Sequence, residues 1–385
     1  MSAAQQQRPD LAVIGGGAIG LSVAWRACQR GLSVTVLERA QPGDGSSGVA
    51  AGMLAPVTEA SFGEDELLAL NRESARRWPA FAAELAQASG VDPGYRRSGT
   101  LLAAADNDAA AALEREVAYR ESLGLPVQRL LPSAARALEP GLAPRLRAAM
   151  LAPEDHAVDP RALVAALAAA VTRAGGEVRT GCEVAAVELD GDGDRLAGIR
   201  LAGGGSLSVA DVVVAAGCWS PILGGVRPDA RPPVRPVKGQ ILRLRDPAGA
   251  GLLDRVLRTS EIYVVPRGDG RYVLGATVEE RGFDTAVTAG GVHDLLAHAG
   301  EVLPGIAELE LEEASAGLRP GTPDNAPIIG SGALGGLHWA TGHHRNGILL
   351  APVTADIVVE ALRGEPASEL ADPFSPDRFA PGVPA

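Results

Sequence analysis

The sequence contains few cysteines, and they follow no structural pattern. Its 385 residues include three, Cys28, Cys182 and Cys218, which stand far apart in the chain. An odd count without regular spacing excludes a disulfide framework, and neither these residues nor the six histidines have metal-ligand spacing. We therefore expect no metal site and a reduced, cytoplasmic environment, where free thiols persist.

The sequence also lacks a long apolar segment. The longest apolar run with helical periodicity, residues 163–171, is far shorter than the roughly 20 residues of a membrane-spanning helix. Residues 1–9 are polar, without the apolar core of a secretory signal, and are expected to form a frayed tail. These features predict a protein without stable membrane association.

Basic residues are outnumbered by acidic ones. The chain has 35 Lys and Arg against 47 Asp and Glu, a net charge of −12, and the basic residues form no stripe. This charge pattern argues against nucleic acid as a partner. Hydrophobic residues make up 46% of the chain, which together with its length predicts two globular domains.

Residues 10–39 carry the strongest pattern in the chain. The apolar residues 11–14 predict a buried strand, residues 19–29 a helix and residues 32–37 a second strand. Parallel strands need such a crossover helix, so this is a βαβ unit. The sequence therefore predicts an α/β fold with a Rossmann-like domain.

Three glycines, Gly15, Gly17 and Gly20, connect the first strand to the helix as G-x-G-x-x-G. The first permits a tight turn, the second lets a pyrophosphate approach the backbone, and the third lets helix and strand pack closely. The helix start offers free N–H groups to phosphate. Glu38 ends the second strand, where a carboxylate can reach a ribose hydroxyl, so the unit predicts a dinucleotide site.

Residues 41–56 are rich in small side chains, with no bulky one before Met53. The segment is either a flexible loop or backbone that lies against a flat ligand. Ser46 and Ser47 can cap the following helix or bond phosphate. With a dinucleotide site directly upstream, we favour a second contact with the cofactor.

The βαβ pattern is then interrupted twice. Residues 64–153 contain predicted helices and a strand outside the pattern, and residues 230–312 contain mostly antiparallel strands. Between them, Asp159 and Pro160 are typical N-cap and first-turn residues of a helix that restores the pattern. The antiparallel strands are expected to form a sheet that faces the cofactor.

Small-residue turns follow two further strands. Residues 210–216 predict a buried strand ending in GCWS, which is either a cofactor-side turn or simply the end of a strand. Residues 337–341 predict another, followed by GHHRNG and a helix over residues 348–363. A glycine-rich turn entering a helix suits an anionic or carbonyl group of a ligand.

Six segments together resemble the D-amino-acid oxidase (DAO) family of flavoproteins, and within it the glycine oxidase branch of thiamine biosynthesis. They are GGGAIG, AAGMLAP, VVAAGCWS, VKGQ, RPGTPDNAPIIG and GHHRNGILLAP. The similarity spans residues 10–363, and AAGMLAP and GxxRNGILLAP are its specific signatures. The resemblance implies FAD as the cofactor, held by a domain in three separated pieces beside a substrate domain with a large mixed or antiparallel sheet.

The implied domains are discontinuous in sequence. The FAD-binding domain would comprise residues 1–85, 151–225 and 319–385, and the substrate-binding domain residues 86–150 and 226–318. The implied cofactor-binding residues are Gly15, Gly17, Ala18, Ile19, Gly20, Glu38, Arg39, Ser46, Ser47, Ala51, Gly52, Met53, Val184, Gly217, Trp219, Arg345, Asn346, Gly347, Ile348 and Leu349.

For the substrate, the family pattern implies Arg319, Tyr263 and the backbone near Arg345. On the residues alone, Arg319 is equally well a surface arginine or a partner of Asp324, but a guanidinium is well suited to bind both oxygens of a carboxylate. Two departures from the family stand out. His344 takes a place often held by an aromatic residue, and no cysteine follows Cys218 for a covalent link, so the FAD is expected to be non-covalent.

The implied activity is oxidative deamination of glycine and other small amines or D-amino acids to the imino acid and then the oxo acid. Oxygen would be reduced to hydrogen peroxide, and the product would feed thiamine thiazole synthesis. The flavin accepts the hydride, so no side chain is needed as acid or base when the amine binds neutral. The expected partners are the small amine, O2 and further copies of the chain in a homo-oligomer.

Two other functions stay open, and the sequence argues against a third. A D-amino-acid dehydrogenase of the same fold would pass electrons to a quinone, but the sequence lacks a basic or strongly apolar membrane patch. A non-catalytic flavin-binding subunit would not need Arg319 and Tyr263. A nicotinamide dehydrogenase would leave AAGMLAP and the last glycine-rich turn without a role.

Overall fold

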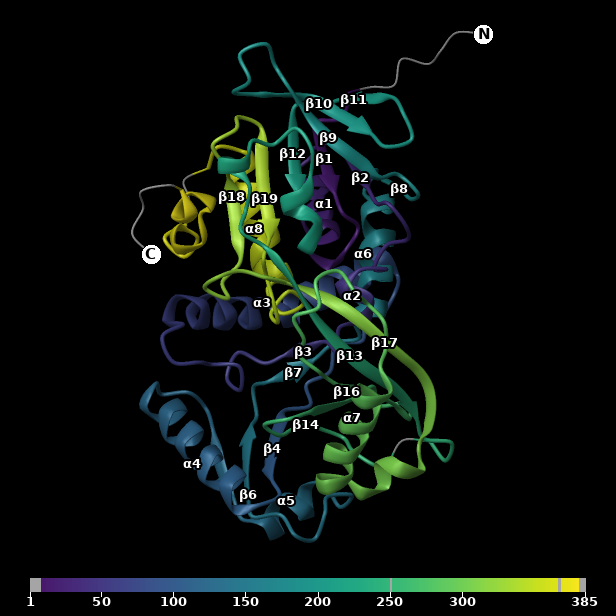
Figure 1. Cartoon of the computed structure of the whole chain (residues 1–385), viewed down its shortest axis with the longest axis vertical. Helices are drawn as coiled ribbons and strands as arrows, with labels where there is room; N and C mark the ends of the chain where they lie inside the picture. The colour runs from purple at the N-terminus through teal and green to yellow at the C-terminus, as the bar shows by residue number, and fades with distance from the viewer. Residues whose placement is uncertain (1–7, 250, 366–367, 381–385) are drawn as a thin grey trace.

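The computed structural model describes residues 8–249, 251–365 and 368–380. Most of the tail expected at residues 1–9 lies outside this range. The molecule is elongated, with one sheet in the upper half of Figure 1 and a second, larger sheet in the lower half. In the part of the chain described, no helix combines the length and apolar character needed to cross a membrane.

The upper sheet has six strands in the order β18-β19-β12-β1-β2-β8. From β19 to β8 neighbouring strands are parallel, whereas β18 runs antiparallel to β19. The strands are β1 (Leu11–Ile14), β2 (Val34–Leu37), β8 (Glu177–Arg179), β12 (Asp211–Val214), β18 (Ile328–Ser331) and β19 (Leu337–Thr341). Three distant parts of the chain thus build one Rossmann-like sheet, which confirms the predicted α/β class.

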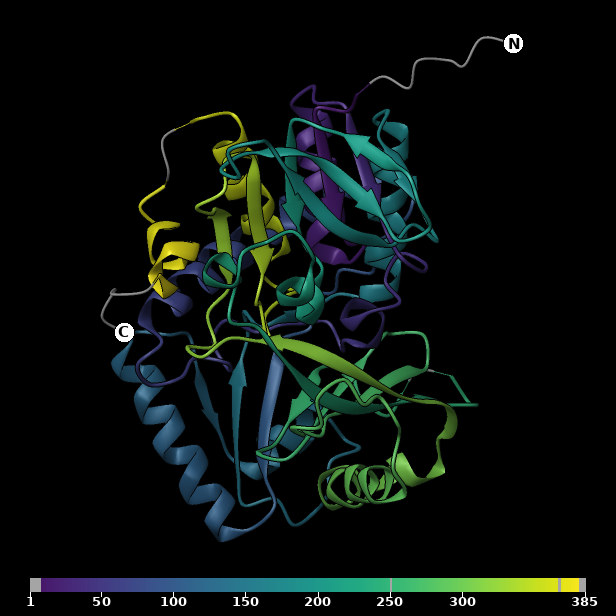
Figure 2. The same cartoon turned by 45° about the horizontal axis from the view of Figure 1, so that its top comes forward.

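Helices cover one face of this sheet and a small sheet covers the other. The helices are α1 (Ala18–Gln29), α3 (Asp65–Ser89), α6 (Pro160–Arg173) and α8 (Ala351–Leu362). Their core includes Trp25, Trp78 and Phe81, all almost fully buried. Figure 2 shows the small sheet on the opposite side, made of β9 (Val184–Leu189), β10 (Leu196–Leu201) and β11 (Ser206–Ser208).

The lower sheet has eight strands in the order β17-β13-β16-β15-β14-β4-β6-β5. Only β4 and β14 pair in parallel, so the sheet is mixed, as predicted. Its strands are β4 (Thr100–Ala104), β5 (Gln128–Leu130), β6 (Ala148–Ala152), β13 (Arg235–Arg245), β14 (Val256–Arg258), β15 (Tyr263–Pro266), β16 (Arg271–Gly275) and β17 (Glu310–Gly321). The helices packed on it are α4 (Asn107–Ser122), α5 (Pro132–Leu138) and α7 (Ala289–Val302).

Short elements complete the chain. A two-stranded sheet pairs β3 (Met53–Leu54) with β7 (His156–Ala157), and α2 (Ser46–Val49) is a single turn. The 3₁₀ helices are η1 (Gly217–Ile222), η2 (Pro228–Ala230), η3 (Pro304–Glu308), η4 (Asp372–Phe374) and η5 (Pro376–Phe379).

The predicted helix starting at Pro160 forms with Asp159 as its N-cap, accepting from the Arg161 N–H at 3.0 Å. The sequence did not predict β17, because this strand lies at the sheet edge and its first three residues are exposed, so it lacks buried alternation. The last helix begins at Ala351 rather than residue 348 because turns occupy the preceding residues. The domain boundaries stay a prediction; β6 and β17 each run across one of them.

Candidate active site

A cavity of about 890 Å³ lies between the two sheets, with walls contributed by both. At one end it is lined by the β1–α1 turn and Glu38, and at the other by Tyr263 and Arg319. Within the described residues, no cluster of three or more His, Cys, Asp or Glu side chains has the arrangement of a metal site.

The glycine-rich turn is closely packed where the cavity begins. Gly15 has a φ of +111°, and a Cβ there would stand 2.5 Å from the Ala215 carbonyl oxygen. A Cβ on Gly20 would stand 2.0 Å from the Gly15 carbonyl oxygen, so Gly20 serves the packing of α1 and does not line the cavity. Only glycine fits these two positions, and the turn leaves open space at the start of α1.

Glu38 is fixed at the end of β2 by two backbone donors. Its Oε2 accepts from the Gly16 N–H at 2.7 Å and its Oε1 from the Ala40 N–H at 3.0 Å. Each carboxylate oxygen can accept further hydrogen bonds, so ribose hydroxyls have an oriented acceptor. Beside it, the Arg39 guanidinium lies 3.8 Å from the ring centroid of Trp219, and both residues line the cavity.

The two serines of the second segment are placed by neighbouring elements. The Ser47 hydroxyl accepts from the Ala18 N–H at 3.0 Å and therefore caps α1, whereas α2 has no side-chain cap. The Ser46 hydroxyl donates to the Leu318 carbonyl of β17. Neither serine therefore caps the helix that follows it, as the sequence had suggested. Ser46 instead links the segment of residues 41–56 to the lower sheet.

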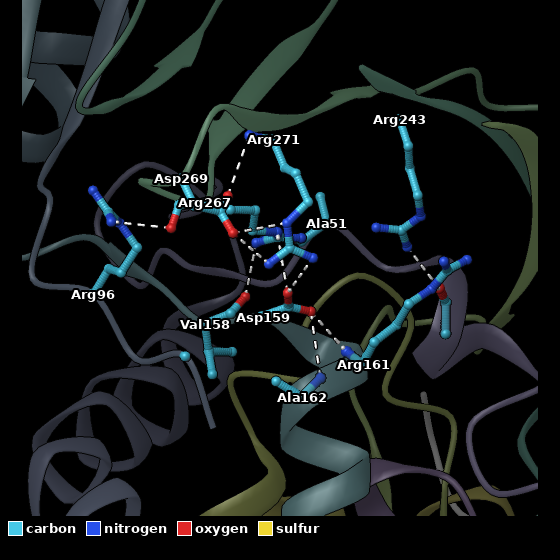
Figure 3. Close-up of polar contacts among 12 residues, drawn as sticks. Ala51, Arg96, Val158, Asp159, Arg161, Ala162, Arg243, Arg267, Asp269 and Arg271 are labelled. Atoms are coloured by element: carbon cyan, nitrogen blue, oxygen red, sulfur yellow. Dashed lines mark hydrogen bonds and ion pairs between the residues drawn. The ribbon is translucent and has the colours of Figure 1, made fainter. Parts of the chain in front are cut away.

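Arginines hold the backbone carbonyls of Gly48 and Ala51, and Figure 3 shows Arg267 beside Ala51. Arg267 donates to the Ala51 carbonyl at 2.8 Å and to the Val158 carbonyl at 3.0 Å. Arg243 and Arg161 both donate to the Gly48 carbonyl. Burial lowers the pKa of Arg267 to about 10, which still leaves it charged at neutral pH. Arginines from the lower-sheet part of the chain thereby fix the segment that contains Gly48 and Ala51. This segment forms part of the cavity wall.

At the other end, Arg319 of β17 and Tyr263 of β15 lie over glycines of neighbouring strands. Arg319 Nη1 donates to the carbonyls of Lys238 at 3.3 Å and Thr277 at 3.2 Å. A Cβ on Gly239 would stand 2.4 Å from its guanidinium nitrogens. Burial raises the pKa of the Tyr263 hydroxyl, and the neighbouring Arg319 opposes that rise. The two side chains present donors to the same end of the cavity.

The sequence did not predict that Glu59 and Arg258 belong to this site. Glu59 is 8% exposed and lies between Arg258, which donates to it, and Arg345, whose Nη1 is 3.3 Å away. Burial alone would raise the pKa of Glu59, but the two guanidiniums hold it below its usual value. Glu59 is therefore anionic at neutral pH. The sequence offered one signal for Glu59: it is a charged residue that follows an apolar stretch, six residues after Met53.

The two adjacent histidines of GHHRNG have different surroundings. His344 lines the cavity in a left-handed backbone conformation with φ +45°. Burial, together with Arg345 and Arg319, lowers its pKa to about 4. His343 is fully buried against the Thr354 hydroxyl, and burial lowers its pKa to about 3. Both rings are neutral at physiological pH.

Of the residues assigned to the site from sequence, all but Gly20 and Leu349 line this one cavity. The Leu349 carbonyl faces α3 instead, where it accepts from Ser74 at 2.6 Å and from Trp78 at 2.8 Å. The residues present fit FAD: a glycine turn with room for pyrophosphate, an oriented carboxylate for ribose, and small residues along the wall. A Cβ on Gly52, for example, would stand 2.1 Å from the Val158 carbonyl oxygen.

Comparison with known proteins agrees with this site. Residues 10–361 match the family model of DAO, described as FAD dependent oxidoreductase. The chain is 36% identical to the glycine oxidase of Geobacillus kaustophilus over 96% of both proteins. A crystal structure of glycine oxidase from that organism superposes with a TM-score of 0.89, covering 96% of this chain and 98% of the other at 34% identity.

A longer relative shares the same region. The bifunctional protein ThiO/ThiG of Synechocystis is 34% identical over 97% of this chain, which spans 54% of the relative's length. The matched region contains the glycine-rich turn, Glu38 and the segments that form the cavity. The chain belongs to the DAO family of FAD-dependent oxidoreductases.

Proposed function

We propose that the protein oxidises glycine and other small amines or D-amino acids to the imino acid. Two electrons and a proton leave the substrate as a hydride, and the imino acid is hydrolysed to the oxo acid and ammonia. Molecular oxygen takes the two electrons and becomes hydrogen peroxide. FAD supplies the hydride acceptor when bound, and the glycine oxidases among the relatives support the substrate class.

The observation that carries this proposal is the pairing of Arg319 with Tyr263 at the end of the cavity away from Glu38. Arg319 is held through Nη1 by two backbone carbonyls, so its orientation is fixed before the substrate arrives. A guanidinium in a fixed orientation binds both oxygens of a carboxylate, and the Tyr263 hydroxyl can donate to the same group. This fixes the α-carbon relative to the rest of the cavity.

Glu59 and His344, which line the cavity, are both weak bases. Two arginines hold the pKa of Glu59 below its usual value, and burial with neighbouring cations lowers the pKa of His344 to about 4. The residues bind and orient the amino acid, and the amine binds in its neutral form. Residues 345–348 would lie along the flavin ring, with Gly15 and Gly17 of the glycine-rich turn at the pyrophosphate.

We also propose that the product serves thiamine thiazole synthesis in the cytoplasm. The bifunctional ThiO/ThiG relatives support this assignment, since their matched region covers nearly this whole chain. The competing candidate, a D-amino-acid dehydrogenase, would use a quinone in place of oxygen.

The test is stopped-flow reduction of the purified holoenzyme. Glycine, sarcosine or D-alanine should bleach the oxidised flavin without oxygen, and air should restore the colour with one peroxide per flavin. Bleaching followed by reoxidation that is rapid only with a quinone would favour the dehydrogenase. A flavin that none of the three amines bleaches would refute the proposed function.

A further inference from the structure

We propose that Lys238 and Glu279 are positioning residues for Arg319. They hold in place the two backbone carbonyls that orient its guanidinium, and in this way they set the affinity of the cavity for a carboxylate. The inference rests on the proposed function, in which Arg319 anchors the substrate carboxylate. Neither Lys238 nor Glu279 lines the cavity, so both act from behind its wall.

The Arg319 side chain reaches across strand β13. Arg319 itself belongs to β17, which pairs with one edge of β13. Its Nη1 donates at 3.2 Å to the carbonyl of Thr277, which lies at the opposite edge, where residues 276–288 connect β16 to α7. The Lys238 carbonyl, in β13, accepts from the same nitrogen at 3.3 Å. The orientation of Arg319 therefore depends on how the 276–288 connection is held against β13.

The start of this connection is tied to β13 by both backbone and side chains. Lys238 and Glu279 form an antiparallel bridge, in which each backbone N–H donates to the carbonyl of the other at 2.9 and 3.0 Å. The Gln240 N–H donates to the Thr277 hydroxyl at 2.9 Å. Glu279 Oε1 in turn accepts from this hydroxyl at 2.6 Å and from Gln240 Nε2 at 2.7 Å. Glu279 thus joins β13 to the residue that carries one of the two carbonyls.

The Lys238 ammonium is buried on the far side of the strand. Its side chain is 1% exposed, and because side chains alternate along a strand, it points away from the cavity that Gly239 lines. Its Nζ donates to Asp284 at 2.9 Å and lies 3.6 Å from Glu279. A buried charge is unfavourable unless it is paired. The ammonium therefore favours the arrangement in which the 276–288 connection lies against β13.

The alternative is that this network stabilises the fold without affecting the anchor. A binding experiment without turnover separates the two. Acetate carries a carboxylate and acetamide is its uncharged isostere, and each can be titrated into the FAD-loaded protein by its perturbation of the flavin spectrum. A displaced Arg319 should weaken the binding of acetate, whereas acetamide, which has no charge to pair, should bind nearly as before.

Glu279 and its neighbour Glu280 provide a matched pair of variants. Glu280 also forms an ion pair with a residue of β13, Arg235, at 3.0 Å, but its side chain is 68% exposed. We expect Glu279→Ala to weaken acetate binding at least about tenfold, the effect of losing one charged hydrogen bond, and Glu280→Ala to leave it unchanged. Lys238→Met, which removes the charge and keeps a long side chain, should weaken acetate binding as well. FAD content should stay near the wild-type value in all three variants.

An acetate affinity that Glu279→Ala or Lys238→Met leaves unchanged would overturn the proposal, as would an equal loss in Glu280→Ala. If Glu279→Ala does not fold, Glu279→Gln decides, because it keeps an acceptor for the Thr277 hydroxyl but loses the charge that faces Lys238. Acetate binding about threefold weaker than in Glu280→Gln would support the positioning role. Equal affinities of these two variants would overturn it.

Arg319→Ala distinguishes the positioning role from the proposed function. Acetate affinity that is lost in Arg319→Ala but kept in Glu279→Ala overturns the positioning role and leaves the anchor in place. If Arg319→Ala binds acetate as the wild type does, the anchor and the positioning role are both wrong. Failure of glycine to bleach the flavin refutes the proposed reaction, whereas acetate binding tests the positioning without any reaction.

Discussion

The Arg319 guanidinium lies directly over Gly239, so close that a Cβ on this glycine would stand 2.4 Å from both terminal nitrogens. The two residues belong to the neighbouring strands β17 and β13. The absence of a side chain at Gly239 therefore makes the space in which Arg319 is held. The VKGQ segment, which the sequence singled out without a role, acquires one: the Lys238 carbonyl orients Arg319 and Gly239 makes room for it.

Gly239→Ala should displace Arg319 and lower kcat/KM for glycine by about 100-fold, because a shift of about 1 Å in a positioning group has that effect. FAD content should stay near the wild-type value, since Gly239 belongs to the lower sheet and is not among the residues assigned to the cofactor. Gly290→Ala is the control, as a Cβ there meets nothing within 4 Å. Steady-state kinetics that match the wild type would show that Arg319 does not depend on this space.

Arg319 itself should be the anchor of the substrate carboxylate. Arg319→Ala should lower kcat/KM by about 100-fold or more, and Arg319→Lys should recover little, because an ammonium keeps the charge without the planar fork. Flavin absorbance should report normal FAD content in both variants. If Arg319→Ala oxidises glycine with near-normal kcat/KM, the substrate binds elsewhere.

Glu38→Ala should weaken FAD binding by about 1.5–3 kcal/mol, the contribution of hydrogen bonds to a charged acceptor. Part of the loss would come from the Gly16 N–H, which donates to this carboxylate at 2.7 Å. Titration of the apoprotein with FAD measures the effect, and saturating FAD should restore the wild-type rate. An unchanged FAD affinity contradicts the assignment of Glu38 to the ribose.

FAD should leave the protein when it is denatured. The three thiols are Cys28, Cys182 and Cys218; Cys218 is buried, and burial raises its pKa to about 12, so it stays a poorly reactive thiol. After precipitation with acid, the yellow colour should appear in the supernatant. Flavin that remains with the pellet after washing would demonstrate a covalent link.

Stability should fall between pH 7 and pH 5.5 because of His343 and His344. Their pKa values in the folded protein, about 3 and about 4, lie below the ordinary value, so the unfolded chain binds more protons in this range. Each histidine should cost about 1.2 kcal/mol at pH 5.5 relative to pH 7, and Asp155, whose burial raises its pKa to about 6, should offset part of this loss. Denaturant unfolding at both pH values measures the change, and His344→Asn should reduce it by the share of one histidine. A pH-independent unfolding free energy would contradict the burial of neutral rings.

The sequence by itself determined the cofactor-binding unit. Gly15, Gly17 and Glu38 lie within one βαβ unit, where strand, turn and helix geometry fix their relative positions locally. The Pro160 helix was equally predictable, because its cap and first-turn residues are adjacent in sequence. The family resemblance then assigned Arg319 and Tyr263 to the substrate site. Both line the same cavity as Gly15, Gly17 and Glu38.

Only the tertiary structure decided how the substrate end is assembled. Arg258 reaches Glu59 across 199 residues, and Arg319 reaches the Lys238 carbonyl across 81. The periodicity of a strand assigns a face to each side chain but cannot say which distant strand will be its neighbour. Three features depend on strand order and register in the lower sheet: the role of Gly239, the contacts of Glu59 with two arginines, and the arginines bound to the Gly48 and Ala51 carbonyls. The lower sheet acquires this order and register only when its separated segments pair.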